Sequence, residues 1–330
     1  MPKPILISGI QPSGRLHIGN YLGALKHFTE LQDGGKYDCF FFVADYHSIT
    51  EPFKPKKKQQ EITNLLRTYR AAGIDAAKST VFIQSHIPEH TELAWILAAI
   101  TPYGELARMT QFKDKSKSAP RNINAGLLTY PILMAADILL YDAAAVPVGE
   151  DQLQHLELTR ELARRFNKEF GKVFTEPKPL MTETPRLMSL NNLEKKMSKS
   201  LPKGCLFLDD SPKEIRTKIS GAVTDSGDEV RYDEENKKGI SNLMGIYRGF
   251  SGKSLKEIEE EFRGKGYKEF KAALSELLIE KLAPFRETSY SDKELQNITA
   301  GGDKKASTIA GRKLTEIKKK LGLLSQPLDT

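Results

Sequence analysis

Three short apolar runs separated by helical patterns place the strongest constraint on how this chain can fold. The runs are "PILISGI" at residues 4–10, "DCFFFVA" at 38–44 and "STVFIQS" at 79–85, each short enough for a buried strand. Between them, apolar residues recur at helical spacing from Ile18 to Leu31 and again from Ile62 to Tyr69. Strands that alternate with helices in this way form a parallel sheet with right-handed crossover connections. The sequence therefore predicts an α/β domain with a Rossmann-like parallel sheet.

The remaining patterns predict a second, helical domain. A basic loop is expected at 113–122, a helix near 124–140 and a further strand at 143–149 ("AAAVPVG"), which leads into a strongly amphipathic helix. After residue 205 the patterns are almost entirely helical. We therefore expect a Rossmann-like domain at 1–204, which ends in a lysine-rich loop, and an all-helical domain at 205–330 whose last helix can pack back on the first domain.

Charge and cysteine content narrow the classes of partner. The 330 residues carry 50 Lys and Arg against 43 Asp and Glu, a net charge of +7 that favours a polyanion such as nucleic acid but is also compatible with a well-solvated surface. The two cysteines lie far apart and form no CxxC pair, which argues against a zinc or iron–sulfur site. The longest apolar stretch contains Asp137 and Asp142, which argues against a membrane span. No signal peptide is recognised, and we expect a cytoplasmic protein.

The turn "PSGRLHIGNY" at residues 12–21 follows the first predicted strand. Ligands of open parallel sheets bind beyond the carboxyl ends of the strands. Glycines at 9, 14 and 19 allow backbone to approach a ligand, and His17 and Asn20 supply hydrogen-bond donors beside a helix N-terminus. The turn therefore suits phosphate, although it is neither a GxxxxGK loop nor a GxGxxG loop. The glycines alone are explained as well by a plain turn in which His17 caps the helix.

A second segment, "KMSKS" at residues 196–200, follows a further lysine at 195 in a polar connection. A lysine-rich loop can hold the charge of a polyphosphate as it leaves. Taken alone, such a run is usually a solvated surface. Its occurrence far downstream of the "HIGN" turn at 17–20 makes the pair distinctive.

Together the two segments resemble the HIGH and KMSKS motifs of the class I aminoacyl-tRNA synthetases. Within that class, the blocks "GELARMTQFKDKS", "LLTYPILMAADILLY" and "VPVGEDQLQHLELTRELARRFN" resemble the bacterial tryptophanyl-tRNA synthetases, densely over about residues 4–250 and loosely beyond. The resemblance implies that ATP and tryptophan form tryptophanyl-adenylate and pyrophosphate, and that tryptophan then passes to its tRNA. It also implies that Mg²⁺ accompanies ATP without a protein metal site, and that two chains form a homodimer across which tRNA lies.

The resemblance assigns site residues one by one. His17 would lie near the ATP phosphates, Leu187 would contact adenine, and Gly149 would begin the segment that holds the ribose. The residues assigned to ATP are Gln11, Pro12, Ser13, Gly19, Asn20, Gly149, Glu150, Asp151, Leu187, Lys196, Met197, Ser198, Lys199 and Ser200. The residues assigned to tryptophan are Ile7, His47, Tyr130, Met134, Asp137, Val146, Val148 and Gln152. The residues assigned to catalysis are His17, Lys115, Lys196 and Lys199.

Asp137 is the residue that bears on specificity. It lies inside an apolar run, where an unpaired carboxylate is costly, so it needs a partner. Indole offers one N–H, which only donates, and an ionised aspartate only accepts. On a helix, Met134 and Tyr130 lie about one and two turns before Asp137 and share its face. The resemblance implies that Asp137 takes the indole N–H while Tyr130 and Gln152 take the α-amino group. A local cap or a nearby lysine would satisfy the carboxylate equally well.

The sequence also departs from the commonest family pattern. Tyr46 separates Asp45 from His47 where the family often has Gln, Ile7 replaces a frequent Phe, and Leu201 follows the lysine loop in place of an acidic residue. Three alternatives remain open: a tyrosyl-tRNA synthetase, which shares the fold and both motifs, a small nucleotidylyltransferase, and a tRNA-binding paralogue without catalysis. The helical half and the lysine loop argue against the nucleotidylyltransferase.

Overall fold

The computed structural model describes residues 2–118, 123–181 and 187–323. The chain divides into two compact units that are each discontinuous in sequence. The first unit comprises Met1–Ser13, Phe28–Thr182 and Tyr290–Thr330, and the second comprises Gly14–His27 and Glu183–Ser289. The unit boundaries thus differ from the expected division at residue 204, because the "HIGN" turn belongs to the second unit and the last helix to the first.

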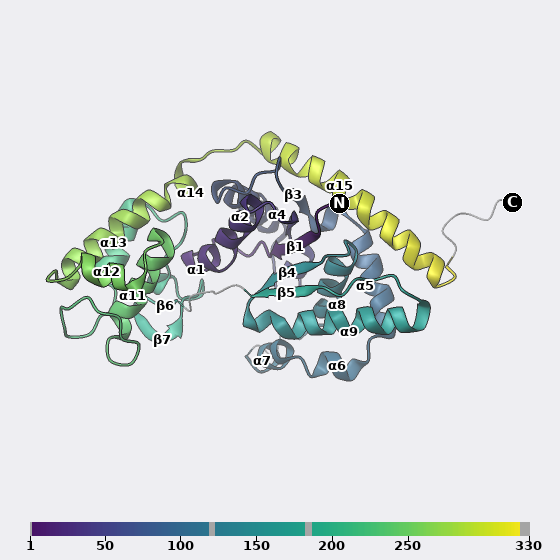
Figure 1. Ribbon diagram of the computed structural model, residues 1–330, viewed down its shortest axis with the longest axis horizontal. Helices are drawn as coiled ribbons and strands as arrows, with labels where there is room; N and C mark the ends of the chain where they lie inside the picture. Colours follow the sequence, from purple (N-terminus) through teal and green to yellow (C-terminus); the bar gives the residue numbers. More distant parts are fainter. Residues whose placement is uncertain (1, 119–122, 182–186, 324–330) are drawn as a thin grey trace. The chain divides into compact units, whose positions relative to one another are not determined.

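A five-stranded parallel sheet forms the centre of the first unit (Figure 1). Its order is β3-β2-β1-β4-β5, which confirms the predicted Rossmann-like sheet and all four predicted strands. The strands are β1 (Ile5–Ile10), β2 (Asp38–Val43), β3 (Thr80–Ile83), β4 (Ala145–Val148) and β5 (Lys178–Met181). The sequence analysis missed β5 because only four residues form it and they are mostly exposed.

Helices cover both faces of this sheet, as the side-chain alternation of β2 requires. Phe40 and Phe42 face the main apolar core, whereas Phe41 stacks on Phe28 at a ring distance of 4.5 Å, with Tyr69 beside them. The helical elements are α2 (Lys26–Asp33), α3 (Asp45–Ser48), α4 (Pro55–Ala71), η2 (Gln84–His86), α5 (Glu89–Ile100), α6 (Tyr103–Ala107), α7 (Thr110–Ser118), α8 (Ala125–Leu139), η4 (Glu150–Gln152), α9 (Leu153–Phe170) and α15 (Asp292–Lys320).

The last helix, α15, packs on β3 within the first unit, as the sequence analysis expected (Figure 1). Gly302 makes the approach possible, because a Cβ there would collide with the Val81 carbonyl oxygen. The helix begins at Asp292, well before its apolar pattern becomes clear, because the Ser291 hydroxyl and the Glu294 carboxylate form a capping box.

The expectation of a basic loop at 113–122 is wrong for its first half. Residues Thr110–Ser118 form the helix α7, which includes the first half of that segment. Lysine is a good helix former, and "KDKSK" contains neither Gly nor Pro to end a helix, so high charge was a poor sign of a loop here. Residues 119–122 lie outside the described part of the chain.

The second unit is mainly helical. Helices α10 and α11 both pack on α13, where the rings of Tyr247, Phe262 and Phe270 contact one another. Its elements are α1 (Ile18–Asn20), η1 (Tyr21–Leu25), β6 (Met188–Ser189), β7 (Asn192–Lys196), η5 (Pro202–Gly204), α10 (Pro212–Ser220), α11 (Lys238–Ser251), α12 (Leu255–Glu261), α13 (Tyr267–Lys281) and α14 (Ala283–Glu287). In neither unit do the described residues include a helix with the length and apolar character needed to cross a membrane.

Candidate active site

The carboxyl edge of the sheet gathers many of the predicted site residues of the first unit. Strands β1 and β4 are neighbours at the point where the strand order reverses, which is where ligands of such sheets bind. Gln11, Pro12 and Ser13 follow β1, and Gly149 and the short helix η4 follow β4. His47 lies in α3, directly after β2. The topology therefore brings residues from three separate segments to one edge.

Asp137, in α8, is the centre of a buried polar cluster. The residue is 1% exposed. His47 Nε2 lies 2.7 Å from Oδ2, while His90 Nδ1 at 2.6 Å and Gln84 Nε2 at 2.7 Å both contact Oδ1. Burial alone would raise the pKa of Asp137, but the interaction with His47 and the hydrogen bonds from both histidines lower it to about 2. Asp137 is therefore ionised at neutral pH, and its protein partners are neither a helix cap nor a lysine.

Two of these partners were missed in the sequence analysis. Gln84 follows β3, and its Oε1 accepts a hydrogen bond from the Tyr46 backbone N–H at 3.1 Å, which turns the amide NH₂ group toward Asp137. His90 lies in α5 and is wholly buried, with Nε2 2.8 Å from the Tyr141 hydroxyl. A histidine within the largely apolar segment that forms α5 was the available signal, because a buried histidine needs polar partners.

Most of the other predicted tryptophan residues belong to the apolar core of the first unit or pack against it. Ile7, Val146 and Val148 belong to the buried apolar core, and Met134 packs against that core while partly exposed. The ring of Tyr130 lies 6.3 Å from that of His47, measured between centroids. The four apolar residues thus share the core of the first unit, while Tyr130 is placed by its contact with His47. Gln152 lies in η4, where its Nε2 donates to Asp151 Oδ2 at 3.0 Å.

The Tyr130 hydroxyl is part of a smaller polar group. It lies 3.0 Å from Gln111 Oε1 and 2.7 Å from His155 Nε2. Burial and the nearby charge of Asp151 raise the pKa of Tyr130 to about 12, so the phenol keeps its proton at neutral pH. Donation to Gln111 leaves the phenol oxygen able to accept hydrogen bonds from other groups.

In the second unit, the "HIGN" turn is fixed by its own side chains. His17 Nδ1 accepts from the Gly19 N–H at 3.1 Å, and Asn20 Oδ1 accepts from the His17 N–H at 3.0 Å, a capping box at the start of α1. Burial, assisted by the charges of Lys199 and Lys196, lowers the pKa of His17 to about 4. His17 is therefore neutral at pH 7, and because Nδ1 accepts, the proton is on Nε2.

The lysine loop lies close to this turn in the second unit. Phe207 forms an isolated antiparallel bridge with His17, and the Ile18 N–H donates to the Leu206 carbonyl at 3.0 Å. Arg15 binds Asp210, which is wholly buried, at 3.0 Å. The segment that follows the lysine loop is thus anchored directly on the turn, which accounts for the effect of both lysines on His17.

Residues 196–200 were expected to form a loop, but Lys196 is the last residue of β7. Met197 is 3% exposed, and its N–H donates to the Leu187 carbonyl at 2.9 Å, so the residue assigned to adenine is paired with the loop. The Ser198 and Ser200 hydroxyls lie 2.9 Å apart. Lys196 is exposed and Lys199 is partly buried. Buried Met197 thus anchors the segment that carries both lysines.

The predicted ATP residues are distributed over both units. Gln11, Pro12, Ser13 and Gly149–Asp151 belong to the first, whereas His17, Gly19, Asn20, Leu187 and residues 196–200 belong to the second. Lys115 lies in α7, and its side chain is outside the described part of the structure. Among the described residues, no group of three or more His, Cys, Asp or Glu side chains is arranged to hold a metal ion.

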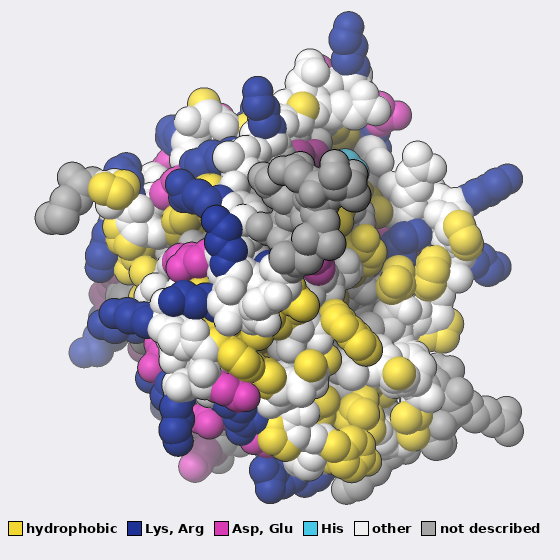
Figure 2. Space-filling model, turned by 90° about the vertical axis from the view of Figure 1, so that its right-hand side faces the viewer, with side chains coloured by type: hydrophobic (Ala, Val, Ile, Leu, Met, Phe, Trp, Pro, Cys, Tyr) yellow, Lys and Arg dark blue, Asp and Glu magenta, His cyan; other side chains and the backbone are white. Residues whose placement is uncertain are grey.

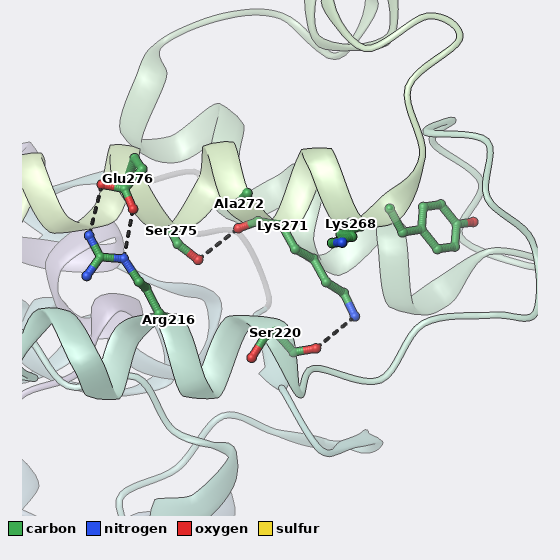
Figure 3. Close-up of a pocket in the computed structure, with 8 residues that line it drawn as sticks. Arg216, Ser220, Lys268, Lys271, Ala272, Ser275 and Glu276 are labelled. Carbon is green, nitrogen blue, oxygen red and sulfur yellow. Dashed lines mark hydrogen bonds and ion pairs between the residues drawn. The ribbon is translucent and has the colours of Figure 1, made fainter.

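A separate pocket of about 440 Å³ lies in the second unit between α10 and α13 (Figure 3). It contains none of the residues assigned to ATP or tryptophan. Lys271 donates to the Ala222 carbonyl at 2.7 Å, Arg216 is paired with Glu276 at 2.9 Å, and Lys268 is exposed. Burial lowers the pKa of Lys271. The charged side chains of the lining are thus three basic residues and one acidic residue, Glu276.

Comparison with known proteins agrees with this geometry. Residues 2–283 match the family described as tRNA synthetases class I (W and Y), and the chain belongs to that family. It is 48% identical to the tryptophan–tRNA ligase of Bacillus anthracis, over 97% of this chain and 98% of that one. The tryptophanyl-tRNA synthetase structure from Mycoplasma pneumoniae has a TM-score of 0.88 at 37% identity and covers 98% of this chain and 99% of that one. The structure from Campylobacter jejuni, complexed with ADP and tryptophan, has a TM-score of 0.81 at 37% identity and covers 97% of this chain and 100% of that one.

Proposed function

We propose that this chain is an ATP-dependent tryptophan–tRNA ligase. The carboxylate of tryptophan attacks the α-phosphorus of ATP, pyrophosphate leaves, and tryptophanyl-adenylate remains. The terminal ribose hydroxyl of the tRNA then takes the tryptophanyl group, and AMP leaves. The single observation that carries the amino-acid assignment is Asp137, a buried and ionised acceptor inside the otherwise apolar helix α8.

The hydrogen-bond count at Asp137 fits indole. A carboxylate offers about four acceptor positions, and described donors occupy three of them, from Gln84, His90 and His47. One acceptor position, on Oδ2, matches the single N–H of indole. Tyr130, through its phenol oxygen, and Gln152 would both accept from the α-ammonium. Ile7, Met134, Val146 and Val148 would enclose the ring.

Phosphate transfer would depend on position and charge, because such displacements need little covalent work from the protein. Neutral His17 would donate from Nε2 to a phosphate oxygen. Lys196 and Lys199 would stabilise the charge that develops on pyrophosphate, with Lys115 as a third cation. Gln11, Pro12, Ser13, Gly19, Asn20, Leu187, Ser198, Ser200 and Gly149–Asp151 would line ATP. Mg²⁺ would enter with ATP, bound by phosphate oxygens, and would supply further charge neutralisation.

Exposed apolar side chains and positive charge indicate two kinds of partner, a second copy of this chain and tRNA. Trp95 is 77% exposed and Tyr103 is 72% exposed. In the view of Figure 2, hydrophobic side chains lie close together on part of the surface. Large exposed apolar patches mark protein interfaces, which supports a homodimer. The net charge of +7 and the basic pocket in the second unit support tRNA as the large partner. A role in charging tRNA supports the expected cytoplasmic location.

Pyrophosphate exchange tests the reaction. Purified protein with ATP and Mg²⁺ is assayed for exchange of labelled pyrophosphate into ATP with each of the twenty amino acids in turn. We expect exchange that depends on tryptophan. Comparable exchange with tyrosine would favour the tyrosyl alternative, and no exchange with any amino acid would favour the non-catalytic alternative.

A further inference from the structure

Asp137 belongs to a chain of buried polar groups that continues beyond the carboxylate. His90 Nδ1 lies 2.6 Å from Asp137 Oδ1, and His90 Nε2 lies 2.8 Å from the Tyr141 hydroxyl. His90 is 0% exposed and Tyr141 is 1% exposed. The His90 ring packs against Phe42 and Phe82, with centroid distances of 6.2 and 6.0 Å. Both polar side chains are therefore enclosed by the core.

The direction of each hydrogen bond in the series Asp137–His90–Tyr141 follows from the protonation of Asp137 and Tyr141. Ionised Asp137 only accepts, so His90 Nδ1 carries a proton and donates. Burial and the nearby charge of Asp137 raise the pKa of Tyr141, which keeps its proton at neutral pH. If His90 were an imidazolium, both of its nitrogens would donate, and the Tyr141 proton would have no acceptor among the described residues. A neutral His90 that accepts at Nε2 from Tyr141 satisfies every group.

We propose that His90 and Tyr141 are positioning residues that select tryptophan by holding Asp137 in one orientation as a pure acceptor. This inference rests on the proposed function, in which Asp137 binds the indole N–H. Tyr141 sets the tautomer of His90, His90 fixes Oδ1, and the remaining acceptor position on Oδ2 keeps a constant direction. The other His90 tautomer would place a lone pair against the carboxylate. Asp137 would then rotate or take up a proton, and a protonated carboxyl group presents a donor that repels an N–H.

The test compares two substrates that differ only at the contact. In β-(benzothiophen-3-yl)alanine, sulfur replaces the indole N–H, while ring shape and the amino-acid end stay the same. Tyr141→Phe removes one hydroxyl and keeps the buried ring. We expect kcat/KM for tryptophan in pyrophosphate exchange to fall by about 3- to 10-fold, mostly through a higher KM. This range corresponds to the loss of one neutral hydrogen bond. We expect the analogue to change by less than about two-fold, because it makes no bond to Asp137.

Tyr69→Phe is the matched control. Tyr69 is also 1% exposed, and its hydroxyl donates to the Phe42 carbonyl at 2.9 Å, outside the Asp137 cluster. Its ratio of tryptophan to analogue activity should equal that of the wild type even if its melting temperature falls. A second comparison uses His90→Asn, which keeps a donor near Asp137, and His90→Leu, which does not. His90→Asn should retain more of the preference for tryptophan over the analogue than His90→Leu.

A spectroscopic readout tests the tautomer directly. The chain has six histidines, so ¹⁵N labelling of histidine alone gives a spectrum that single His→Asn variants can assign. Wild-type His90 should show the Nδ1–H tautomer, and Tyr141→Phe should shift its Nε2 resonance. Equal losses for both substrates in Tyr141→Phe, or an Nε2–H tautomer in the wild type, would overturn the proposal. A wild type that uses the analogue as well as tryptophan would reject the indole contact of Asp137, and the proposal with it. Absence of any tryptophan-dependent exchange would instead reject the proposed function itself.

Discussion

Asp137 shows how an apolar helix retains a charge. Three donors from three other segments converge on the carboxylate, so its removal leaves those donors without their acceptor. We expect Asp137→Ala to lower kcat/KM for tryptophan by roughly 10- to 100-fold, the cost of one hydrogen bond to a charged group. Asp137→Asn should lose less, since its carbonyl still accepts.

Steady-state pyrophosphate exchange with tryptophan and tyrosine checks this prediction. The KM for ATP should stay near the wild-type value in both variants, because the residues assigned to adenine lie elsewhere. Unchanged selectivity for tryptophan over tyrosine in Asp137→Ala would mean that Asp137 is structural only.

His17 gives a prediction about pH. Its pKa is lowered from 6.5 to about 4 in the folded chain, so between these values the unfolded chain binds more protons. The free energy of unfolding should therefore fall as the pH drops from 6.5 to 4, by an amount on the order of 2 kcal/mol from this group, and should be unaffected by it above pH 6.5. Melting curves of wild type and His17→Asn check this. The Asn side chain can still accept from the Gly19 N–H. The free energy of unfolding of His17→Asn should therefore change less between pH 4 and 6.5 than that of the wild type, and equal changes would contradict the lowered pKa of His17.

Helix α15 approaches the backbone of β3 closely at Gly302. A Cβ at Gly302 would collide with the Val81 backbone, whereas one at Gly301 would have nothing within 4 Å. We expect Gly302→Ala to destabilise the first unit by about 1–3 kcal/mol through overpacking. Gly301→Ala, the matched control, should be neutral or stabilising by about 0.5–1 kcal/mol, since alanine favours a helix. Chemical denaturation measures both, and equal effects would mean that α15 does not pack closely in solution.

The lysine loop that follows β7 offers a prediction about rate. If Lys199 acts on charge that develops during transfer, Lys199→Ala should lower the rate of adenylate formation on the order of 10²–10³-fold with little change in the KM for ATP. Lys195, exposed within β7, is the control, and Lys195→Ala should stay within a few-fold of wild type. Single-turnover kinetics separates the two. A near-normal rate for Lys199→Ala would make the loop an ordinary charged surface.

At the level of the whole molecule, we expect the protein to bind tRNA mainly through electrostatic attraction. Binding of tRNA to a basic protein releases counterions, so the logarithm of affinity should fall linearly with the logarithm of salt concentration. Lys268→Ala, at the pocket of Figure 3, should reduce the magnitude of that slope by about 1, as expected for the loss of one phosphate contact. Lys256→Ala, at an exposed position in α12, should leave the slope unchanged. Fluorescence titration across salt concentrations measures the slopes. A flat response would exclude tRNA as this partner.

Much of the fold could be predicted because the signals are local. The apolar runs that became β1, β2, β3 and β4 are short and flanked by helical periods, and this alternation alone requires a parallel sheet. Strand β5 and helix α7 lacked such a signal, since one is mostly exposed and the other is highly charged. The two discontinuous units were also beyond the sequence, because contacts between segments distant in the chain decide compactness.

The candidate site also has features that the sequence predicts and features that only the tertiary structure decides. From the sequence by itself came the parallel sheet, the two motifs, and the requirement that a carboxylate at position 137 have a partner, since these depend on periodicity, spacing and the cost of burying a charge. Which partners it has was decided only by the tertiary structure. Gln84, His90 and His47 come from separate segments, and Tyr141 reaches His90 from beyond the end of α8. A hydrogen bond needs its groups within about 3 Å, and only the packing of β2, β3, α5 and α8 brings these side chains that close.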